Sequence, residues 1–243
     1  MKIAYLDCSN GISGDMFLAA MLDAGLDIID LRRELAKLPI SGYGVSLKKV
    51  RVGGINTSRL MVRVNQPQHL RYLPDIRRII RESSLAPAVK KRSGRIFTRL
   101  AEAEAKVHGC KIDQVHFHEI GALDTIIDIV GVAWGVHKLG IKKLFCSPIN
   151  VGSGTIRMAH GIFPVPAPAT AELLKNIPYY QSIVKQELAT PTGVVLAKEM
   201  SFGFGALPQM NITSIGQSSG SRQISGHINL FRLLIGNLLK DQS

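Results

Sequence analysis

The sequence predicts an α+β fold built from mixed α/β layers, and three features of the chain support this. Residues 2–7 form a short apolar run ending in a carboxylate, as in a strand that leads through a glycine-containing loop into a helix. Residues 44–64 alternate between apolar and polar side chains, as in a half-buried β-hairpin. Residues 124–139 place apolar side chains on most sides of a helix, which is therefore predicted to be central and buried.

Glycine and proline residues separate the remaining elements. In the first half of the chain the predicted elements are a strand at 2–7, a helix from about Met16 to Ala24, a helix at 30–38 and the hairpin, which turns at Gly53-Gly54. A polar connection at 65–74 and two helical stretches follow. The second stretch carries Ile96, Leu100, Ala103 and Val107 and ends at Gly109. In the second half they give an extended segment at 114–118, the apolar helix, a strand near Leu144, a glycine loop at 152–154, a proline-containing stretch at 164–168, helices at 170–175 and 191–200, and a strand at 228–235.

Composition and charge narrow the possible classes of protein. The chain is 46% hydrophobic and 20% charged, as a globular protein is, and we expect residues 1–243 to form one compact unit. Its net charge of +12 attracts anions. A solvated basic surface and a phosphorylated small-molecule partner both explain this charge. Nucleic acid is less favoured, because the basic residues lack interleaved aromatics and a recognisable DNA-reading motif.

The chain shows no signal for export or membrane insertion. No stretch approaches the roughly 18 uncharged apolar residues of a membrane span, and Asp7 interrupts any signal-peptide core. The three cysteines are widely spaced and form no Cys-x-x-Cys pair. We therefore expect a cytoplasmic protein with reduced thiols and no membrane partner.

His116 and His118 are the best candidates for metal ligands. In an extended segment both imidazoles lie on one face, about 7 Å apart along the chain, and Phe117 lies on the other. Imidazole suits borderline divalent ions such as nickel and zinc, and Glu119 could act as a further ligand or as a proton acceptor. A structural role for the histidines is the alternative.

Asp124 and Asp128 are candidate catalytic residues together with Glu119. They are four residues apart, so a helix presents both on one face, where they could supply a further ligand or support one. The alternative is structural, because Thr125-x-x-Asp128 resembles a capping box and acidic residues favour a helix N-terminus.

Three segments are candidates for binding a substrate phosphate. The loop before the first helix offers a helix N-terminus, although its two aspartates would repel a bare phosphate unless they share a hard cation such as magnesium. The glycine loop at 152–154 is followed by the cation Arg157 and by the titratable imidazole of His160. The third segment, at Thr190-Pro-Thr192, also fits a simple N-cap, and a capped tight turn is the alternative for the first loop. The candidate residues are Asp7, Ser13, Gly14, Asp15, Gly152, Ser153, Gly154, Arg157, His160, Thr190 and Thr192.

Six motifs in the same order closely resemble the LarC family of nickel insertion proteins, and the resemblance spans nearly the whole chain. They are Tyr5-Leu-Asp7 with Gly11-Ile-Ser-Gly-Asp-Met16, Arg99-Leu-Ala-Glu-Ala-Glu-Ala-Lys-Val-His108, the run from His116 to Gly131, Gly152-Ser-Gly-Thr155, Ala159-His-Gly161 with the run from Pro164 to Thr170, and Thr190-Pro-Thr-Gly193.

The resemblance implies a function. It implies nickel insertion into pyridinium-3,5-bisthiocarboxylic acid mononucleotide to form the nickel-pincer cofactor of lactate racemase, by a CTP-dependent chelatase of the lyase class. It selects nickel over zinc as the ion at His116, His118 and Glu119. The expected partners are the phosphorylated pyridinium thiocarboxylate nucleotide as substrate, lactate racemase, and further copies of the chain in a homo-oligomer.

Two departures from the family limit this expectation. Family members commonly carry a histidine-rich stretch after the hairpin, where this chain has only His69 between Asn65 and Arg71. They also usually continue into a C-terminal domain that binds CTP with Mg²⁺ or Mn²⁺, whereas this chain ends at Ser243. We therefore expect CTP-driven turnover to need that domain in trans. The alternative functions are a metal-dependent hydrolase of a phosphorylated or nucleotide substrate, with Glu119 as base, and a nickel carrier without catalysis.

Overall fold

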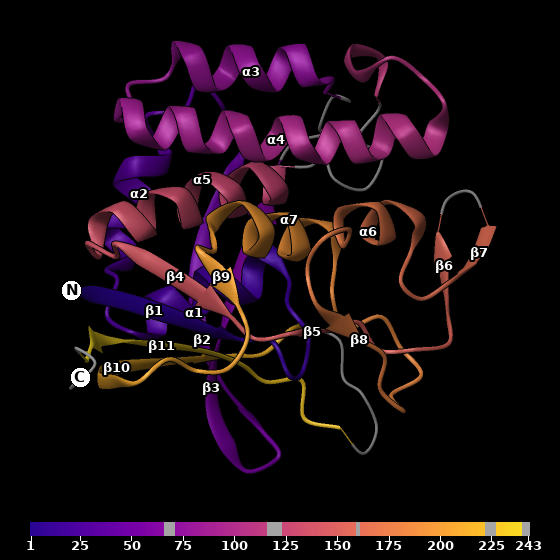
Figure 1. The fold of residues 1–243 in the computed structure, drawn as a ribbon. Helices are drawn as coiled ribbons and strands as arrows, with labels where there is room; N and C mark the ends of the chain where they lie inside the picture. Colours follow the sequence, from indigo (N-terminus) through magenta and orange to yellow (C-terminus); the bar gives the residue numbers. More distant parts are fainter. Residues whose placement is uncertain (66–70, 116–122, 159–160, 222–226, 240–243) are drawn as a thin grey trace.

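The computed structural model describes residues 1–65, 71–115, 123–158, 161–221 and 227–239, which form an α+β fold with helices stacked on a mixed sheet (Figure 1). The sheet has the strand order β2-β3-β10-β11-β1-β4-β9. The bounds are β1 Lys2–Asp7, β2 Tyr43–Val52, β3 Ile55–Val64, β4 Lys143–Cys146, β9 Gly203–Phe204, β10 Met210–Ser218 and β11 Phe231–Leu238. The fold class predicted from the sequence is confirmed.

Strand β1 lies inside the sheet and explains the apolar run at the start of the chain. It pairs antiparallel with β11 and parallel with β4. Ile3, Ala4 and Leu6 are fully buried, because both faces of β1 are covered and both need apolar side chains. The strand therefore fixes the start of α1, which follows it after a short loop.

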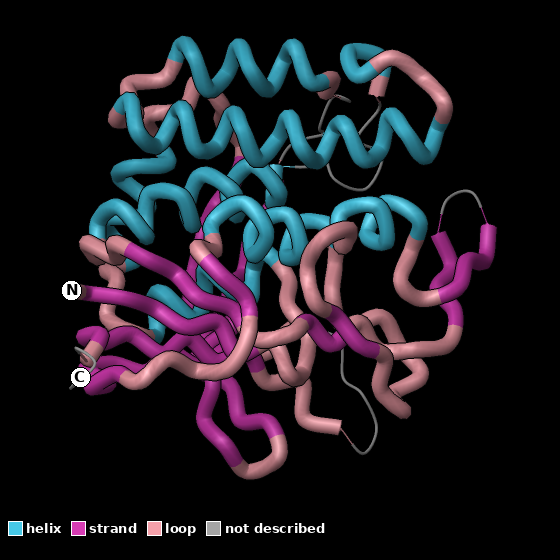
Figure 2. Tube along the Cα trace, viewed as in Figure 1, coloured by secondary structure: helices cyan, strands magenta, loops and turns pink. Residues whose placement is uncertain are grey.

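The helices form successive layers on one side of the sheet (Figures 1 and 2). Helix α1 packs on β3, β10 and β11, α5 packs on α1, α4 packs on α5, and α3 packs on α4. The bounds are α1 Gly14–Asp23, α2 Ile28–Leu35, α3 Leu73–Glu82, α4 Pro87–His108, α5 Leu123–Lys138, α6 Pro168–Leu173 and α7 Pro191–Met200, with a short 3₁₀ helix at Ile112–Gln114. Helix α5 is buried along almost its whole length, so the central helix predicted from the sequence is confirmed.

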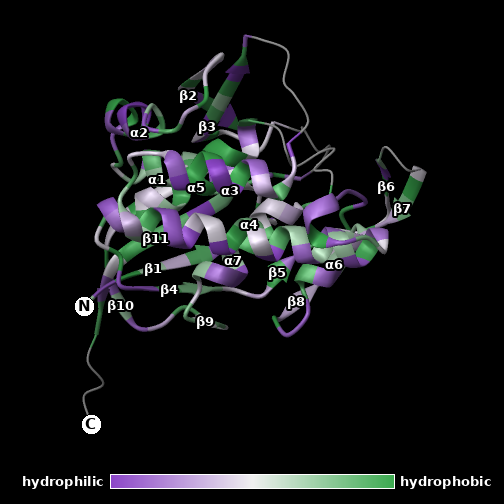
Figure 3. Ribbon diagram, turned by 90° about the horizontal axis from the view of Figure 1, so that it is seen from above, coloured by the Kyte–Doolittle hydropathy of each residue, from purple (hydrophilic) through white to green (hydrophobic). Residues whose placement is uncertain are grey.

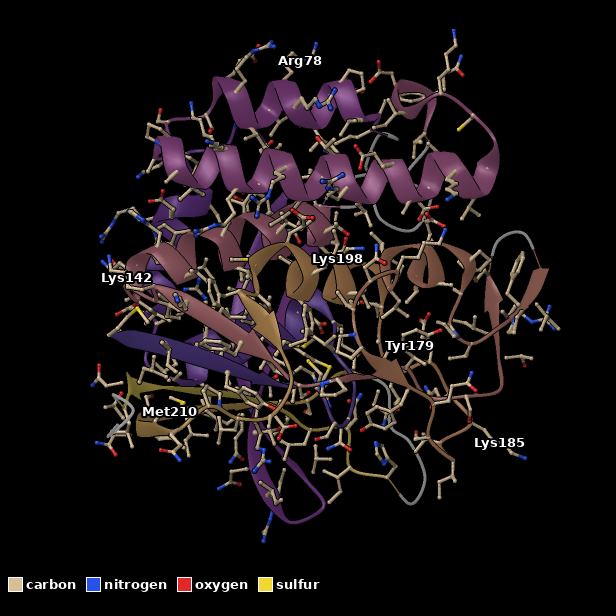
Figure 4. All side chains as sticks on the ribbon, viewed as in Figure 1. Arg78, Lys142, Tyr179, Lys185, Lys198 and Met210 are labelled. Carbon is tan, nitrogen blue, oxygen red and sulfur yellow. The ribbon has the colours of Figure 1, made fainter. Side chains whose placement is uncertain are left out.

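The outermost helices are amphipathic, as their position requires. Helix α3 buries Leu73, Ile76 and Ile80, and Arg78 lies on its outer side (Figure 4). In Figure 3, α3 and α4 carry hydrophilic and hydrophobic residues side by side along their lengths. None of the described helices combines the length and the hydrophobicity that crossing a bilayer requires.

Two small sheets lie on the side of the molecule away from the N-terminus. Strands β6 (Thr155–Met158) and β7 (Gly161–Pro164) form a projecting hairpin, and β5 (Ile149–Asn150) pairs with β8 (Tyr179–Tyr180) (Figure 1). Lys198 of α7, labelled in Figure 4, donates to the carbonyl oxygens of Leu173 and Lys175 at 2.8 Å and so holds the end of α6.

Several predicted boundaries were wrong. The second helix begins at Ile28 rather than at residue 30 because Asp27 caps it, its carboxylate accepting from the backbone N–H of Ile29 at 2.6 Å. Helix α6 begins at Pro168, which occupies its first turn. The extended segment predicted at 114–118 begins in a 3₁₀ helix, and its residues 116–118 lie outside the described part. The last strand is shifted to Phe231–Leu238, and β6, β7 and β10 had not been predicted.

Candidate functional site

The described residues line an open cavity of about 580 Å³ where the N-terminal ends of α1, α5 and α7 meet. Helix α1 contacts both α5 and α7, which brings the three ends together. Strands β3 and β6 supply the opposite, more apolar wall. The lining residues are Ser13, Gly14, Asp15, Leu60, Met61, Val62, Asp124, Thr125, Asp128, Ile156, Arg157, Met158, Ala167, Glu187, Thr190, Pro191, Thr192 and Ser221.

The loop after β1 presents the first turn of α1 to the cavity. The backbone N–H of Ile12 donates to Leu188 at 3.0 Å, and the carbonyl oxygen of Ile12 accepts from Thr190 at 3.0 Å. Ser13 precedes the helix in extended conformation, and its hydroxyl donates to the carboxylate of Asp15 rather than capping a backbone N–H. The loop thus holds the Ser13 and Asp15 side chains at the cavity.

Helix α7 begins at the same place by an ordinary capping device. The Thr190 hydroxyl oxygen accepts from the backbone N–H of Gly193 at 3.3 Å, and Pro191 occupies the first helical position. The capping role considered for Thr190 is confirmed. Thr192 is 9% exposed and also lines the cavity.

Helix α5 contributes two carboxylates, one partly accessible and one buried. Asp124 stands in the first turn, where its carboxylate accepts from the backbone N–H of Thr125 at 2.8 Å. Asp128 is only 7% exposed, and its Oδ1 atom has no hydrogen-bond partner among the described residues. It lies in the second turn of α5, so the capping box considered for Thr125 and Asp128 is wrong.

Position 14 has no room for a side chain, because Asp128 occupies the space that a Cβ atom would take. A Cβ atom at Gly14 would come within 2.5 Å of Asp128 Oδ2 and 2.8 Å of Thr192 Cγ2. The absence of a side chain therefore lets the Asp128 carboxylate reach the N-terminal end of α1.

The two carboxylates of α5 hold protons more tightly than an ordinary aspartate does. Burial raises the pKa of Asp128 well above its ordinary range, and the nearby charges of Asp15 and Asp124 add to this. The pKa of Asp124 is also raised, mainly by burial, with Asp15 contributing. Together with Glu187 they make four carboxylates in the lining, against one cationic side chain there, Arg157.

Eight of the candidate residues named from the sequence line this one cavity: Ser13, Gly14, Asp15, Asp124, Asp128, Arg157, Thr190 and Thr192. They come from four segments that are far apart in the chain. The structure shows that these residues lie together, and their roles stay predictions.

Other candidates are placed elsewhere. Asp7 forms an ion pair with Arg232, whose Nε donates to it at 2.9 Å. The glycine loop at 152–154 uses its backbone to hold residues 184–187, for example through the Ser153 N–H donating to Val184 at 2.9 Å. Neither segment is part of the described lining of the cavity.

The predicted metal ligands His116, His118 and Glu119 lie outside the described residues, as do His160 and His69. Leu123, the first described residue after 116–122, is fully buried and begins α5. Within the described ranges, no group of three His, Cys, Asp or Glu side chains is arranged to hold a metal ion.

Sequence reasoning missed some of the lining. Glu187 and Ser221 belong to loops without a motif, and Leu60, Met61 and Val62 had been assigned only to a hairpin. No local pattern indicates that these residues face the cavity, because their position depends on how distant segments pack.

Comparison with known proteins identifies the family. The nickel insertion protein model matches residues 4–243. A pyridinium-3,5-bisthiocarboxylic acid mononucleotide nickel insertion protein of Desulfitobacterium hafniense is 48% identical over 238 residues, covering 98% of this chain and 59% of that protein. One of Staphylococcus epidermidis is 45% identical over 221 residues, covering 91% and 56%.

A protein of Geotalea daltonii whose name also refers to nickel insertion is 50% identical over 238 residues, covering 97% of this chain and 61% of that protein. The chain thus spans about three fifths of the length of these curated relatives. No solved structure matches it. The match over nearly all of its residues shows that the chain belongs to the nickel insertion protein family.

Proposed function

We propose that this chain takes part in inserting nickel into pyridinium-3,5-bisthiocarboxylic acid mononucleotide, which forms the nickel-pincer cofactor of lactate racemase. The names of two relatives, from Desulfitobacterium hafniense and Staphylococcus epidermidis, support this substrate. The observation that carries the proposal is the cavity where three helix N-termini meet, because eight candidate residues from four distant segments line it. Its volume of about 580 Å³ is in the range of small-molecule sites.

The two walls of the cavity suit the two ends of a pyridinium nucleotide. The guanidinium of Arg157, the hydroxyls of Ser13, Thr190 and Thr192, and the helix N-termini can receive the phosphate, with His160 as a further donor. The apolar wall around Leu60, Ile156 and Met158 can contact the aromatic ring. Asp7 and the glycine loop act indirectly in this arrangement, by holding the segments that carry these residues.

Nickel enters as cargo held by His116 and His118, with Glu119 as a ligand or proton acceptor. Glu119 precedes Asp124 of the cavity by five residues, so no more than about 18 Å of extended chain separates them. The two sulfur donors of the substrate are softer than imidazole nitrogen and draw the ion to the nucleotide. Asp124 and Asp128 support this transfer from the wall of the cavity.

For the complete reaction we expect a domain of the family type that binds CTP with Mg²⁺ or Mn²⁺. The assembly acts in the cytoplasm as a lyase-class chelatase and a homo-oligomer. Lactate racemase receives the product. Adding that domain to the 243-residue chain is expected to make nickel incorporation depend on CTP, and incorporation at an equal rate without CTP would contradict this.

The nickel ligands are tested by calorimetry on three forms of the chain. The wild type is expected to bind Ni²⁺, and the His116→Ala/His118→Ala double variant to bind it at least about 100-fold more weakly, because two ligands are lost. The His137→Ala variant is the control, since His137 is exposed in the last turn of α5. Equal stoichiometry and affinity in the wild type and the double variant would show that His116 and His118 are not the nickel ligands.

A further inference from the structure

The cavity contains an acidic cluster, which we define as Asp15, Asp124 and Asp128. These three carboxylates come from the first turn of α1 and the first two turns of α5. All three line the cavity, and the electrostatic effect of Asp15 on the pKa of Asp128 exceeds that of Asp124. The cluster belongs to the described part of the chain, and none of its three members is one of the predicted nickel ligands.

Asp128 is the member of the acidic cluster that lacks a compensating partner. It is more than nine-tenths buried, and its Oδ1 atom accepts no hydrogen bond among the described residues. Its other oxygen lies against Gly14, whose missing side chain leaves room for it. A buried carboxylate that is neither paired nor hydrogen-bonded is unfavourable unless a proton or a cation compensates it.

The surroundings supply too little positive charge to compensate the cluster. A helix N-terminus is equivalent to about half an elementary charge, and α1 and α5 together provide about one. Arg157 is the cation among the described lining residues, and Glu187 adds a fourth carboxylate. The cavity is therefore acidic within a chain whose net charge is +12.

We propose that the acidic cluster binds a hard divalent cation, Mg²⁺ or Mn²⁺, at a site separate from the cargo nickel. Asp128 and Asp15 are the direct ligands, and Asp124 is joined to the ion through water. Mg²⁺ commonly takes one or two carboxylates and keeps several waters, so it needs no group of three preformed ligands, and the described residues contain none. Carboxylate oxygens favour such ions over the softer metals that imidazole and sulfur favour.

The ion also allows an anion to enter an acidic cavity. This role of the ion rests on the proposed function, in which the substrate carries a phosphate and two thiocarboxylates. Four carboxylates would repel such a molecule, whereas a bound Mg²⁺ would neutralise two of them and offer its remaining positions to phosphate oxygens. Binding of the ion itself does not depend on that substrate.

Mn²⁺ tests the site, because its electron paramagnetic resonance signal distinguishes free from bound ion. The wild-type 243-residue chain is expected to bind one Mn²⁺ that Mg²⁺ displaces. Asp128→Asn and Asp15→Asn are each expected to weaken Mn²⁺ binding at least about tenfold, since even residues behind a ligand contribute 10–100-fold. Asp113→Asn is the matched control, because Asp113 of the 3₁₀ helix is an exposed carboxylate outside the described lining of the cavity.

A second readout guards against misfolded variants. Mg²⁺ is expected to raise the midpoint of thermal unfolding of the wild type and of Asp113→Asn, but not of Asp128→Asn. If Asp128→Asn fails to fold, Mn²⁺ binding by Asp15→Asn tests the site instead. Asp15 is only partly buried, so its substitution is expected to leave the fold intact.

The outcomes separate this site from the nickel site. The His116→Ala/His118→Ala variant is expected to bind Mn²⁺ as the wild type does, even if calorimetry refutes those two nickel ligands. The proposal is overturned if the wild type binds no stoichiometric Mn²⁺, if both Asp→Asn variants bind it normally, or if the histidine variant loses it as well.

Discussion

Gly14 and Asp128 show how single residues determine the shape of the cavity. Sequence reasoning had placed Gly14 in the loop before the first helix and Asp128 on a helix face. Gly14 is the first residue of α1, Asp128 lies in α5, and both line the cavity. No local pattern indicated that the carboxylate fills the space of the missing Cβ atom, because the two residues are more than a hundred positions apart.

The Gly14→Ala substitution tests this close approach. We expect a loss of about 1–3 kcal/mol in the free energy of unfolding, because the new methyl group would displace Asp128 and Thr192. Gly94→Ala in α4 is the matched control, since no atom lies within 4 Å of its Cβ position. That variant should gain about 0.5–1 kcal/mol. Urea unfolding of both checks the prediction, which would fail if the two variants changed stability alike.

The misplaced residues were those with distant partners. Asp7 was named as a candidate for binding phosphate, but Arg232, more than 200 residues later in the sequence, forms an ion pair with it. The glycine loop was named for phosphate, but residues 184–187 take up its backbone groups. In both cases the partner that the structure shows could be found only in three dimensions.

At the scale of elements, Asp23 joins the end of α1 to the sheet. Its carboxylate accepts from Lys49 of β2, from the Ser58 hydroxyl of β3 at 2.5 Å, and from the Gln217 N–H of β10 at 2.8 Å. Burial alone would raise the pKa of Asp23, but these hydrogen bonds outweigh it and hold the pKa below its ordinary value of 3.8.

This lowered pKa makes the contribution of Asp23 depend on pH. A carboxylate whose pKa is lower in the folded state stabilises the fold above its unfolded pKa, and the effect is lost as pH falls through the folded value. Asp23→Asn should therefore cost about 1–2 kcal/mol at pH 7, with the cost shrinking below about pH 3.8. Urea unfolding across this range tests it, with Asp113→Asn as an exposed control. A cost that stays constant down to pH 2 would contradict the assignment.

Strand β10 was missed for a physical reason. Its side toward α1 carries Ser214, Gly216 and Ser218, and the Ser218 hydroxyl donates to the Met16 carbonyl oxygen at 2.6 Å. Small polar residues face the helix because α1 lies too close for larger ones, whereas Ile215 is 47% exposed. The usual apolar-inside alternation is therefore absent. In α7, by contrast, the local cap and proline were sufficient to predict Pro191–Met200.

Gly216→Ala tests the close packing of β10 and α1. A Cβ atom there would overlap the backbone oxygen of Ala20, which cannot move as a side chain can. We expect a loss of about 2–3 kcal/mol in unfolding free energy. Gly44→Ala in β2 is the control, because its Cβ position is open and its stability should change little. Equal stability of the two variants in guanidinium unfolding would refute the packing argument.

At the scale of the whole molecule, the core joins the beginning of the chain to its end. The Phe17 ring of α1 packs against Phe231 of β11, with ring centroids 5.8 Å apart, and both side chains are fully buried. The sequence predicted the helix and the last strand separately, but it offered no means to pair them.

Phe17→Ala should therefore be the most destabilising of the variants considered. We expect a loss of about 3–5 kcal/mol, the usual cost of removing a buried aromatic ring. Phe202→Ala is a suitable comparison, because Phe202 is 65% exposed and makes an edge contact with Phe145. That change should cost about 1 kcal/mol. Similar unfolding midpoints for the two variants would show that the Phe17 contact contributes little.

The position of β11 has a consequence for how the protein is made. Strand β1, the first strand of the described chain, needs β11, which lies more than 200 residues later in the sequence, as its antiparallel neighbour. Pairing of segments so distant along the chain is slow, and unpaired strand edges attract other chains. A nascent chain on the ribosome therefore carries nearly every residue of the cavity before it can complete the sheet, and during that interval chaperones would be most valuable to it.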